Sequence, residues 1–452
     1  MAEATTDPVR LPPAPRIPKV LQGIGFLASR DKAAATLRGR YGSEFTINLP
    51  IFGRTVVISD PALIKEVFTM NTDLIARGGN LGAVLGPGST FSLDGIEHRQ
   101  RRKLLVPPFH GKRMQGYEHI IEEEVLREIA TWREGEEFAT LPSMMRITLN
   151  AILRAVFGAD GAALAELREL LPSMVLQASR LTVMPPAVRR GIGPWSPWAR
   201  VDALRRRYNS VVAELIADAH RDAAIDERSD VLAMLLQARY EDGSPIGDDH
   251  VADELLTLLA AGHETTATTL AWAVERLRRH PRLLTRLAEE VDSGGSELLQ
   301  ATIFEVQRTR PVIDATSRKT RTRIRLGEWV IPEDHALLVS ISLAHASESN
   351  YSDAAAFNPD RFVGNPPDNY AWVPFGGGFR RCIGAAFANM EMLVTLRILL
   401  QEFEFGVTYG AGEPARSRGV AIAPGRGGEA VVYRRQPVLT SAVSADAARV
   451  SA

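Results

Sequence analysis

The chain has 452 residues, of which 45% are hydrophobic and 24% charged, and its formal net charge is −1. These values are typical of a soluble globular protein and argue against a nucleic-acid-binding function. A single cysteine excludes an internal disulfide and is consistent with a reducing compartment, so we expect a cytoplasmic protein.

The chain begins with a proline-rich stretch at residues 11–18 that no long apolar run precedes. We expect residues 1–19 to be flexible and to contain neither a signal peptide nor a membrane anchor. No linker, charge block or repeat divides the interior, so residues 20–436 are predicted to form one domain. Residues 437–452, mostly small, are predicted to be disordered.

Apolar periodicity predicts a mainly α-helical protein with a small β-sheet region. Residues 44–59 alternate in the manner of a β-hairpin, and similar patterns predict strands over 322–331, 336–342 and 419–433. Apolar residues three and four apart predict helices over 120–132, 143–157, 201–222, 251–280 and 385–403.

The middle of the long helix predicted over 249–280 carries polar residues where a buried helix normally carries leucine. Glu264, Thr265 and Thr266 follow a run of small residues that ends at Gly262. Buried polar groups cost free energy unless they are paired. Two interpretations remain open: a functional notch, or threonines that bond back to helix carbonyls. His263 faces away from Thr265, and we expect a core or surface role for it.

Two further motifs follow in the chain. Glu305 and Arg308 are three residues apart on one helix face, where they can pair, although such pairs are usually solvated and contribute little. Cys382 lies in a loop rich in glycine and arginine. Arg380 and Arg381 supply the positive charge that lowers a thiol pKa, so Cys382 is a candidate metal ligand.

The order Phe-x-x-Gly-x-Arg-x-Cys-x-Gly around Cys382, followed by an apolar helix, resembles the heme-binding loop of the cytochrome P450 family. The segment Ala261-Gly-His-Glu-Thr265 is similar to that family's oxygen-activating helix. The resemblance extends from about Leu11 to Arg435. It implies the P450 fold, a heme b cofactor and Cys382 as the axial thiolate of the heme iron.

The resemblance also implies roles for other residues. Thr265 corresponds to the hydroxyl that hydrogen-bonds the oxygen molecule, and Glu264 to the neighbouring acid of a proton relay. Glu305, Arg308 and Arg361 correspond to a buried structural network. The remaining cofactor-binding positions are His98, where many members have tryptophan, Arg102, Ala261, Arg318, Phe375, Gly376, Arg380 and Gly384.

By this resemblance the protein is a monooxygenase that inserts one atom of O2 into an apolar small molecule, such as a lipid, sterol, fatty acid, terpenoid or xenobiotic. Electrons would come from a ferredoxin and an NAD(P)H-dependent ferredoxin reductase, and we expect a monomer, most similar to actinobacterial and mycobacterial members. The expected pocket mouth and roof are residues 73–91 and 171–201, with Thr257, Ala261 and Ile313 as pocket residues.

The basic residues near His98 have two readings. We expect Arg99, Arg101 and Lys103 individually to form a solvated face. Together with Arg381, Lys112 and Arg113 they are also candidates for a patch that receives an acidic electron-transfer protein.

Three other functions remain open at this stage. A heme-thiolate protein can use peroxide or rearrange its substrate without external electrons, although the Glu264–Thr265 pair argues against this. A non-catalytic protein that binds heme or a hydrophobic ligand is the second alternative. The third, a helical protein without a cofactor, requires every motif to be coincidental.

Overall fold

The computed structural model describes residues 2–28, 30–49, 52–78, 81–111, 113–158, 161–183, 193 and 195–436. The tail predicted to be disordered, residues 437–452, lies outside this described part. None of the described helices is both long and apolar enough to cross a membrane.

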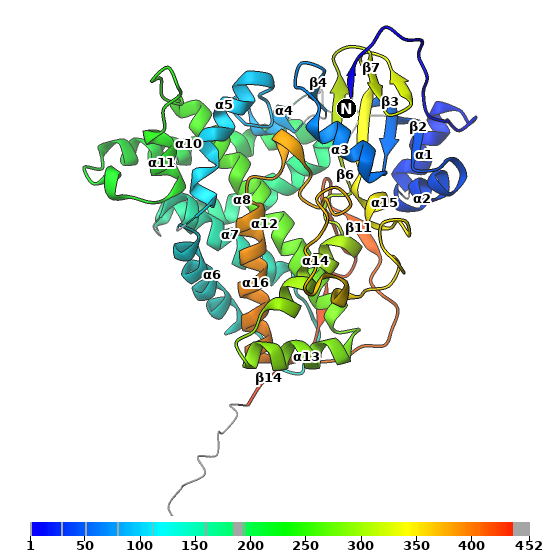
Figure 1. Ribbon diagram of the computed structural model, residues 1–452. Coiled ribbons are helices and arrows are strands. Elements are labelled where there is room, and N and C mark those ends of the chain that lie inside the picture. Colours follow the sequence, from blue (N-terminus) through cyan, green and yellow to red (C-terminus); the bar gives the residue numbers. More distant parts are fainter. Residues whose placement is uncertain are drawn as a thin grey trace, which may run out of the picture.

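Helices form most of the molecule. Most of them occupy its left and lower parts in Figure 1, beside a smaller β-region at the upper right that α1 and α2 flank. The mainly α-helical class with small sheets is therefore confirmed. The α-helices are α1 (Lys19–Ala28), α2 (Arg30–Tyr41), α3 (Pro61–Thr69), α4 (Gly82–Leu85), α5 (Gly95–Leu105), α6 (Arg113–Ile129), α7 (Leu141–Phe157), α8 (Ala162–Thr182), α10 (Pro197–Arg221), α11 (Val231–Gln237), α12 (Asp248–Leu277), α13 (Pro281–Asp292), α14 (Glu297–Thr309), α15 (Ile341–His345) and α16 (Ala385–Glu402).

The strands form a five-stranded sheet of order β2-β3-β9-β6-β4, a three-stranded sheet of order β1-β7-β8, and the pairs β10-β14, β11-β12 and β13-β5. Among the strands of the described residues, β3 and β9 alone pair in parallel. The strands are β1 (Glu3–Ala4), β2 (Glu44–Leu49), β3 (Gly53–Ile58), β4 (Ile75–Arg77), β5 (Phe138–Ala139), β6 (Ala315–Thr320), β7 (Ile324–Leu326), β8 (Trp329–Ile331), β9 (Ala336–Ser340), β10 (Phe403–Phe405), β11 (Ala415–Ser417), β12 (Ile422–Pro424), β13 (Glu429–Ala430) and β14 (Val432–Arg434).

The predicted hairpin over 44–59 is confirmed as β2 and β3, whose partners run from Glu44–Ile58 to Leu49–Gly53. The strand predicted over 336–342 was too long, because Ser340 caps α15 by accepting from the Leu343 N–H over 3.4 Å. The start of the chain, expected to be flexible, makes backbone hydrogen bonds to the β-region. Thr5 donates to the Arg323 carbonyl and Arg10 to the Val330 carbonyl, over 3.1 and 3.0 Å.

The long helix α12 runs through the helical core and packs most extensively against α7, and also against α16, α14 and α10. Its first turn contains Asp248 and Asp249, which suit the positive end of a helix. Pro281 begins the next helix, α13. Neighbouring helices therefore hold α12 in place on several sides.

Candidate functional site

The cysteine lies in a loop that glycines hold close to α3. Cys382 follows the short 3-10 helix η4 (Gly378–Arg380) and precedes α16. Its N–H donates to the Phe375 carbonyl over 3.0 Å. Gly378 has a φ of 66°, and a Cβ there would overlap the carbonyl oxygen of Phe68 in α3, so only glycine fits. The backbone around Cys382 is thus fixed by close packing.

The pKa of the Cys382 thiol differs from the sequence-based expectation. The side chain keeps accessible surface, yet burial among the surrounding atoms raises the pKa of its thiol above the ordinary value. The Gly384 backbone, Arg102 and Arg381 act in the opposite direction. Arg380, expected to lower this pKa, is instead directed to Asp94. The thiol therefore stays protonated near neutral pH unless a metal cation replaces its proton.

Basic side chains from three separate elements gather around one carboxylate beside this loop. Arg318 comes from β6, Arg380 from η4 and His98 from α5, and the carboxylate belongs to Asp94. Arg380 donates to Asp94 over 2.9 Å. Burial, with repulsion from Arg380, lowers the pKa of Arg318 to about 10 and that of His98 to about 3. Positive charge exceeds negative charge in this cluster, which we name the Asp94 cluster.

Arg77 in β4 belongs to the same cluster, and sequence reasoning missed it. Its backbone N–H donates to Asp94 over 3.2 Å. Burial and the Arg380 guanidinium lower the pKa of the Arg77 side chain to about 10. The residue stands inside the glycine-rich segment interpreted as a pocket mouth. An arginine directly before Gly78 was the one local signal available.

Four buried nitrogen atoms of the Asp94 cluster have no hydrogen-bond partner within the described residues: Arg77 Nη2, His98 Nδ1, Arg318 Nε and Arg380 Nε. An unpaired buried donor costs about 1–3 kcal/mol. The arrangement therefore favours a ligand with several anionic oxygens. The two propionates of a heme meet this requirement, and the adjacent Cys382 offers a thiolate for its iron, so the residues present fit a heme.

The middle of α12 keeps a stripe of accessible surface on an otherwise buried helix. Ala261 is exposed, and Leu258 and Thr265 are half-buried on the same face, whereas Leu259 and His263 are buried. The Thr265 hydroxyl donates to the Ala261 carbonyl over 2.7 Å. This bond uses its only proton, so its oxygen can still accept a hydrogen bond from a ligand.

Glu264 is held by an ion pair that the sequence did not reveal. The residue is buried, and its carboxylate accepts from Nε of Arg418 over 3.0 Å. Arg418 lies in the turn between β11 and β12, and the nearby Val420 N–H donates to Ser179 in α8 over 2.8 Å. The turn thus connects the α12 acid to α8. The partners are 154 residues apart, which no local pattern can bridge.

Glu305, Arg308 and Arg361 lie together as a buried network between α14 and the 3-10 helix η3 (Pro359–Phe362). Arg308 binds both carboxylate oxygens of Glu305 over 2.7 Å. Arg361 Nε and the Asn358 N–H reach the same carboxylate over 3.4 and 2.8 Å. The remaining Arg308 donors bind the carbonyls of His345, Ala354 and Ala356.

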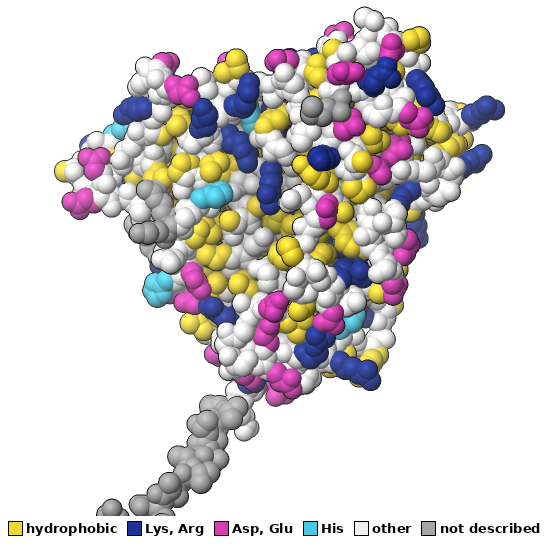
Figure 2. Space-filling view, in the orientation of Figure 1, with side chains coloured by type: hydrophobic (Ala, Val, Ile, Leu, Met, Phe, Trp, Pro, Cys, Tyr) yellow, Lys and Arg dark blue, Asp and Glu magenta, His cyan; other side chains and the backbone are white. Residues whose placement is uncertain are grey.

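The expectation of a solvated face on α5 is wrong for Arg101. This side chain is buried and pairs with Glu254 of α12 over 3.0 Å, while Arg99 and Lys103 are exposed as expected. Arg101 is three residues from His98 and four from Leu105, so helical spacing could have placed it inside. Arg381 is exposed, whereas Lys112 lies outside the described residues and Arg113's side chain is not described. Figure 2 shows basic side chains gathered over α5 and the start of α16.

The expected pocket residues Thr257 and Ile313 make different contacts. The Thr257 hydroxyl is buried and lies 2.7 Å from both Ser89 Oγ and the Asp253 carbonyl, so it fastens the glycine-rich segment to α12. Ile313 is half-buried and packs on the main core. Of the expected roof, residues 184–192 and 194 lie outside the described residues.

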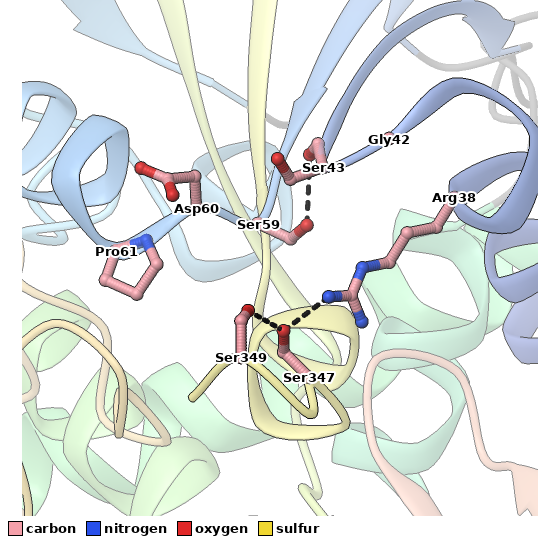
Figure 3. A pocket seen from close by; sticks show the side chains of 8 residues that line it. All are labelled: Arg38, Gly42, Ser43, Ser59, Asp60, Pro61, Ser347 and Ser349. Atoms are coloured by element: carbon pink, nitrogen blue, oxygen red, sulfur yellow. Dashed lines mark hydrogen bonds between the residues drawn. The ribbon is translucent and has the colours of Figure 1, made fainter. Parts of the chain in front are cut away.

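A polar cavity of about 270 Å³ lies between α2, the β2–β3 sheet corner and the segment after α15 (Figure 3). Arg38 donates to Ser347, whose hydroxyl lies 2.6 Å from Ser349 Oγ. Asp60 accepts from the first N–H groups of α3 and so caps that helix. The cavity shares no lining residue with the cysteine loop or α12.

Comparison with known proteins gives consistent results. The family model for cytochrome P450 matches residues 11–426. Cytochrome P450 138 of Mycobacterium tuberculosis is 51% identical over 94% of this chain and 97% of its own length. Cytochrome P450 135B1 of the same organism is 37% identical over 93% and 91%. A solved cyanobacterial CYP120A1 with retinoic acid bound superposes with a TM-score of 0.84 at 22% identity, covering 95% of this chain and 100% of that one, which supports the fold.

Proposed function

Because the chain belongs to the cytochrome P450 family of heme-dependent monooxygenases, we propose that it inserts one oxygen atom of O2 into an apolar small molecule. In this proposal residues 20–436 form one heme-thiolate domain. The observation that carries it is the juxtaposition of Cys382 with the undersatisfied Asp94 cluster. A metal ligand and an anion-binding cluster side by side are what a heme requires.

Each residue has a defined task in this proposal. Cys382 would ligate the iron, and Arg77, His98, Arg318 and Arg380 would hold the propionates, with Arg102 near the thiolate. Bound heme supplies the reductive activation of O2. The Glu305–Arg308–Arg361 network would hold the polypeptide that leads to the cysteine loop.

Proton delivery is assigned to α12. Thr265 presents an oxygen that can accept a hydrogen bond, at the accessible stripe that Ala261 opens. Glu264 is the adjacent carboxylate and Arg418 holds it in one orientation. Small residues at positions 260–262 leave room for O2 above this face. A protein group that controls proton transfer typically changes the rate by orders of magnitude.

Electrons are proposed to come from an acidic ferredoxin, reduced by an NAD(P)H-dependent reductase. The exposed basic residues Arg99 and Arg381 would give the cysteine side of the molecule a positive surface, whereas Lys103 pairs with Glu241 over 2.7 Å. Contacts between exposed charges weaken as salt is added. The rate of reduction by ferredoxin should therefore fall with ionic strength, and a rate independent of salt would exclude this docking surface.

The test of the heme-thiolate assignment is the carbon-monoxide difference spectrum of the dithionite-reduced protein. We expect a strongly red-shifted Soret band in the wild type and its loss in Cys382→Ala. An imidazole-like band, or no heme, would exclude the assignment. Turnover is then measured with NADPH, ferredoxin and reductase across apolar probe compounds, and product formed only with peroxide would point to a peroxygenase instead.

A further inference from the structure

His345 is a buried histidine that lies between α14 and the cysteine loop. It is 1% exposed and is the last residue of α15. Its Nδ1 lies 3.2 Å from the Arg308 carbonyl oxygen, and its Nε2 accepts from the Val373 N–H over 2.9 Å. A carbonyl can only accept and an amide N–H can only donate. The imidazole must therefore be neutral, with its proton on Nδ1.

The surroundings favour this neutral form. Burial, together with the nearby Arg308 guanidinium, lowers the pKa of His345 to about 3 although its hydrogen bond to the Arg308 backbone opposes the shift. In a protonated ring, Nε2 would carry a hydrogen that points at the Val373 N–H. Two donors cannot form a hydrogen bond with each other. The bridge between Arg308 and Val373 therefore exists only with a neutral imidazole.

The His345 bridge joins a fixed arginine at one end to the cysteine loop at the other. On one side Arg308 is fixed by Glu305 and by three carbonyls. On the other side Val373 leads directly into the cysteine loop, since its carbonyl accepts from the Gly376 N–H over 3.0 Å and Phe375 accepts from the Cys382 N–H. A parallel contact is the Trp372 indole, which donates to the Phe304 carbonyl of α14 over 3.1 Å.

We propose that His345 is a positioning residue for the thiolate ligand: it transmits the fixed geometry of the Glu305–Arg308 pair to the loop that carries Cys382. This inference rests on the proposed heme-thiolate function and adds a residue to it. His345 touches neither the thiol nor the Asp94 cluster in any described contact. It acts through the Val373 N–H, and a specific substitution can separate its two hydrogen bonds.

The decisive pair of variants is His345→Gln and His345→Asn. The glutamine amide reaches the position of Nε2 and can keep an acceptor for Val373. The shorter asparagine amide reaches only the position of Nδ1, so it keeps the contact to Arg308 and loses the acceptor for Val373. The readout is the rate at which the reduced carbon-monoxide complex of the holoenzyme loses its thiolate band during mild heating.

We expect His345→Asn to lose the thiolate band about tenfold faster than the wild type, because a buried N–H is left unpaired, and His345→Gln to stay within about twofold. Trp272→Phe is the control, since it deletes a buried hydrogen bond of α12, to the Ile422 carbonyl over 3.0 Å, that does not involve the loop. Equal rates in both His345 variants, or equal acceleration in Trp272→Phe, would overturn the proposal.

A second measurement needs only the wild type and His345→Gln to fold. Nitrogen-15 NMR of labelled histidine in the reduced carbon-monoxide complex, assigned by the signal lost in His345→Gln, must show a neutral ring protonated on Nδ1. A charged ring or the Nε2–H tautomer would contradict the bridge even if His345→Asn fails to fold. A wild type without any thiolate band would instead exclude the proposed function itself, so the two failures are distinguishable.

Discussion

Arg308 and Arg380 are both largely buried arginines, yet their hydrogen bonding differs. All five N–H groups of Arg308 reach acceptors: two oxygens of Glu305 and three backbone carbonyls. Arg380 binds Asp94 and two carbonyls but leaves Nε unpaired, as do Arg318 and, at Nη2, Arg77. A saturated cluster has no capacity for a ligand and serves the fold, whereas an undersaturated one is suited to bind.

The largest effect should come from breaking the Glu305–Arg308–Arg361 network. Arg308→Met strands the buried Glu305 carboxylate, and we expect a loss of about 3–5 kcal/mol in unfolding free energy, with little heme incorporated. Chemical denaturation measures the unfolding free energy of the variant and the wild type. The control is Arg286→Met, which removes an exposed pair with Asp360 at 2.6 Å; exposed pairs contribute about 0–1 kcal/mol. Similar losses in both variants would contradict the distinction.

The same comparison can be made between two hydroxyls of α12. Thr265 and Thr269 each bond back to the carbonyl four residues earlier, over 2.7 and 3.0 Å, but Thr269 is buried and only Thr265 lies on the accessible stripe. We expect Thr265→Ala to lower product formed per NADPH about tenfold, with the electrons appearing as hydrogen peroxide. Thr269→Ala should leave this ratio unchanged. Equal coupling in both variants would show that accessibility is irrelevant here.

A smaller effect should follow from weakening the Asp94 cluster. Arg77→Gln removes a charge that repels Arg380, so the heme-free protein should be as stable as wild type or slightly more so. The holoenzyme loses a charge-assisted hydrogen bond, so heme transfer to apomyoglobin should be about tenfold faster. Arg54→Gln, on an exposed position of β3, is the control. Unchanged heme transfer would remove Arg77 from the site.

The smallest expected effect concerns Glu391 in α16, whose two carboxyl oxygens lack a partner within the described residues while Thr266 faces them. Burial raises the pKa of Glu391 well above its ordinary value of 4.5. The folded carboxyl is thus protonated at a pH where the unfolded one is ionised, which lowers stability increasingly as pH rises above 4.5. Glu391→Gln should therefore raise the thermal midpoint near neutral pH.

The measurement is a series of thermal unfolding curves at decreasing pH. The advantage of Glu391→Gln should shrink as pH falls toward 4.5, where the unfolded carboxyl also becomes protonated. Exposed Glu404 supplies the control variant, Glu404→Gln, which should show no such trend. A constant advantage across pH would mean that Glu391 is ionised in the folded protein.

Periodic and motif-bearing parts of the chain could be predicted from sequence. The β2–β3 hairpin follows from alternation, α12 from its apolar spacing, and the Glu305–Arg308 pair from its helical spacing. The role of Cys382 stays a prediction from its motif. Strand β6 was missed because its residues, Ala315–Thr320, are mostly polar. It lies between β9 and β4 in the sheet, and its Arg318 is buried. A polar strand lacks the usual hydrophobic signature of a buried strand.

Other site residues could not be predicted because their partners are remote in the chain. Arg418 meets Glu264 across 154 residues, and His345 meets Arg308 across 37 and Val373 across 28. Local spacing is informative only within a few turns of helix. The error on Arg101 is of another kind, because its inward direction was encoded in the spacing from His98 but was outweighed by the run of neighbouring charges.

The pairing of β1 with β7 has a practical consequence for recombinant forms of this protein. β1 is an edge strand of the three-stranded sheet and covers β7, and Arg323 also donates to the carbonyls of Thr6 and Asp7 over 3.0 Å. Deleting the first ten residues would remove β1 and uncover the backbone donors and acceptors of β7. Uncovered strand edges recruit strands from other molecules, so the trimmed form should be the one that precipitates during purification.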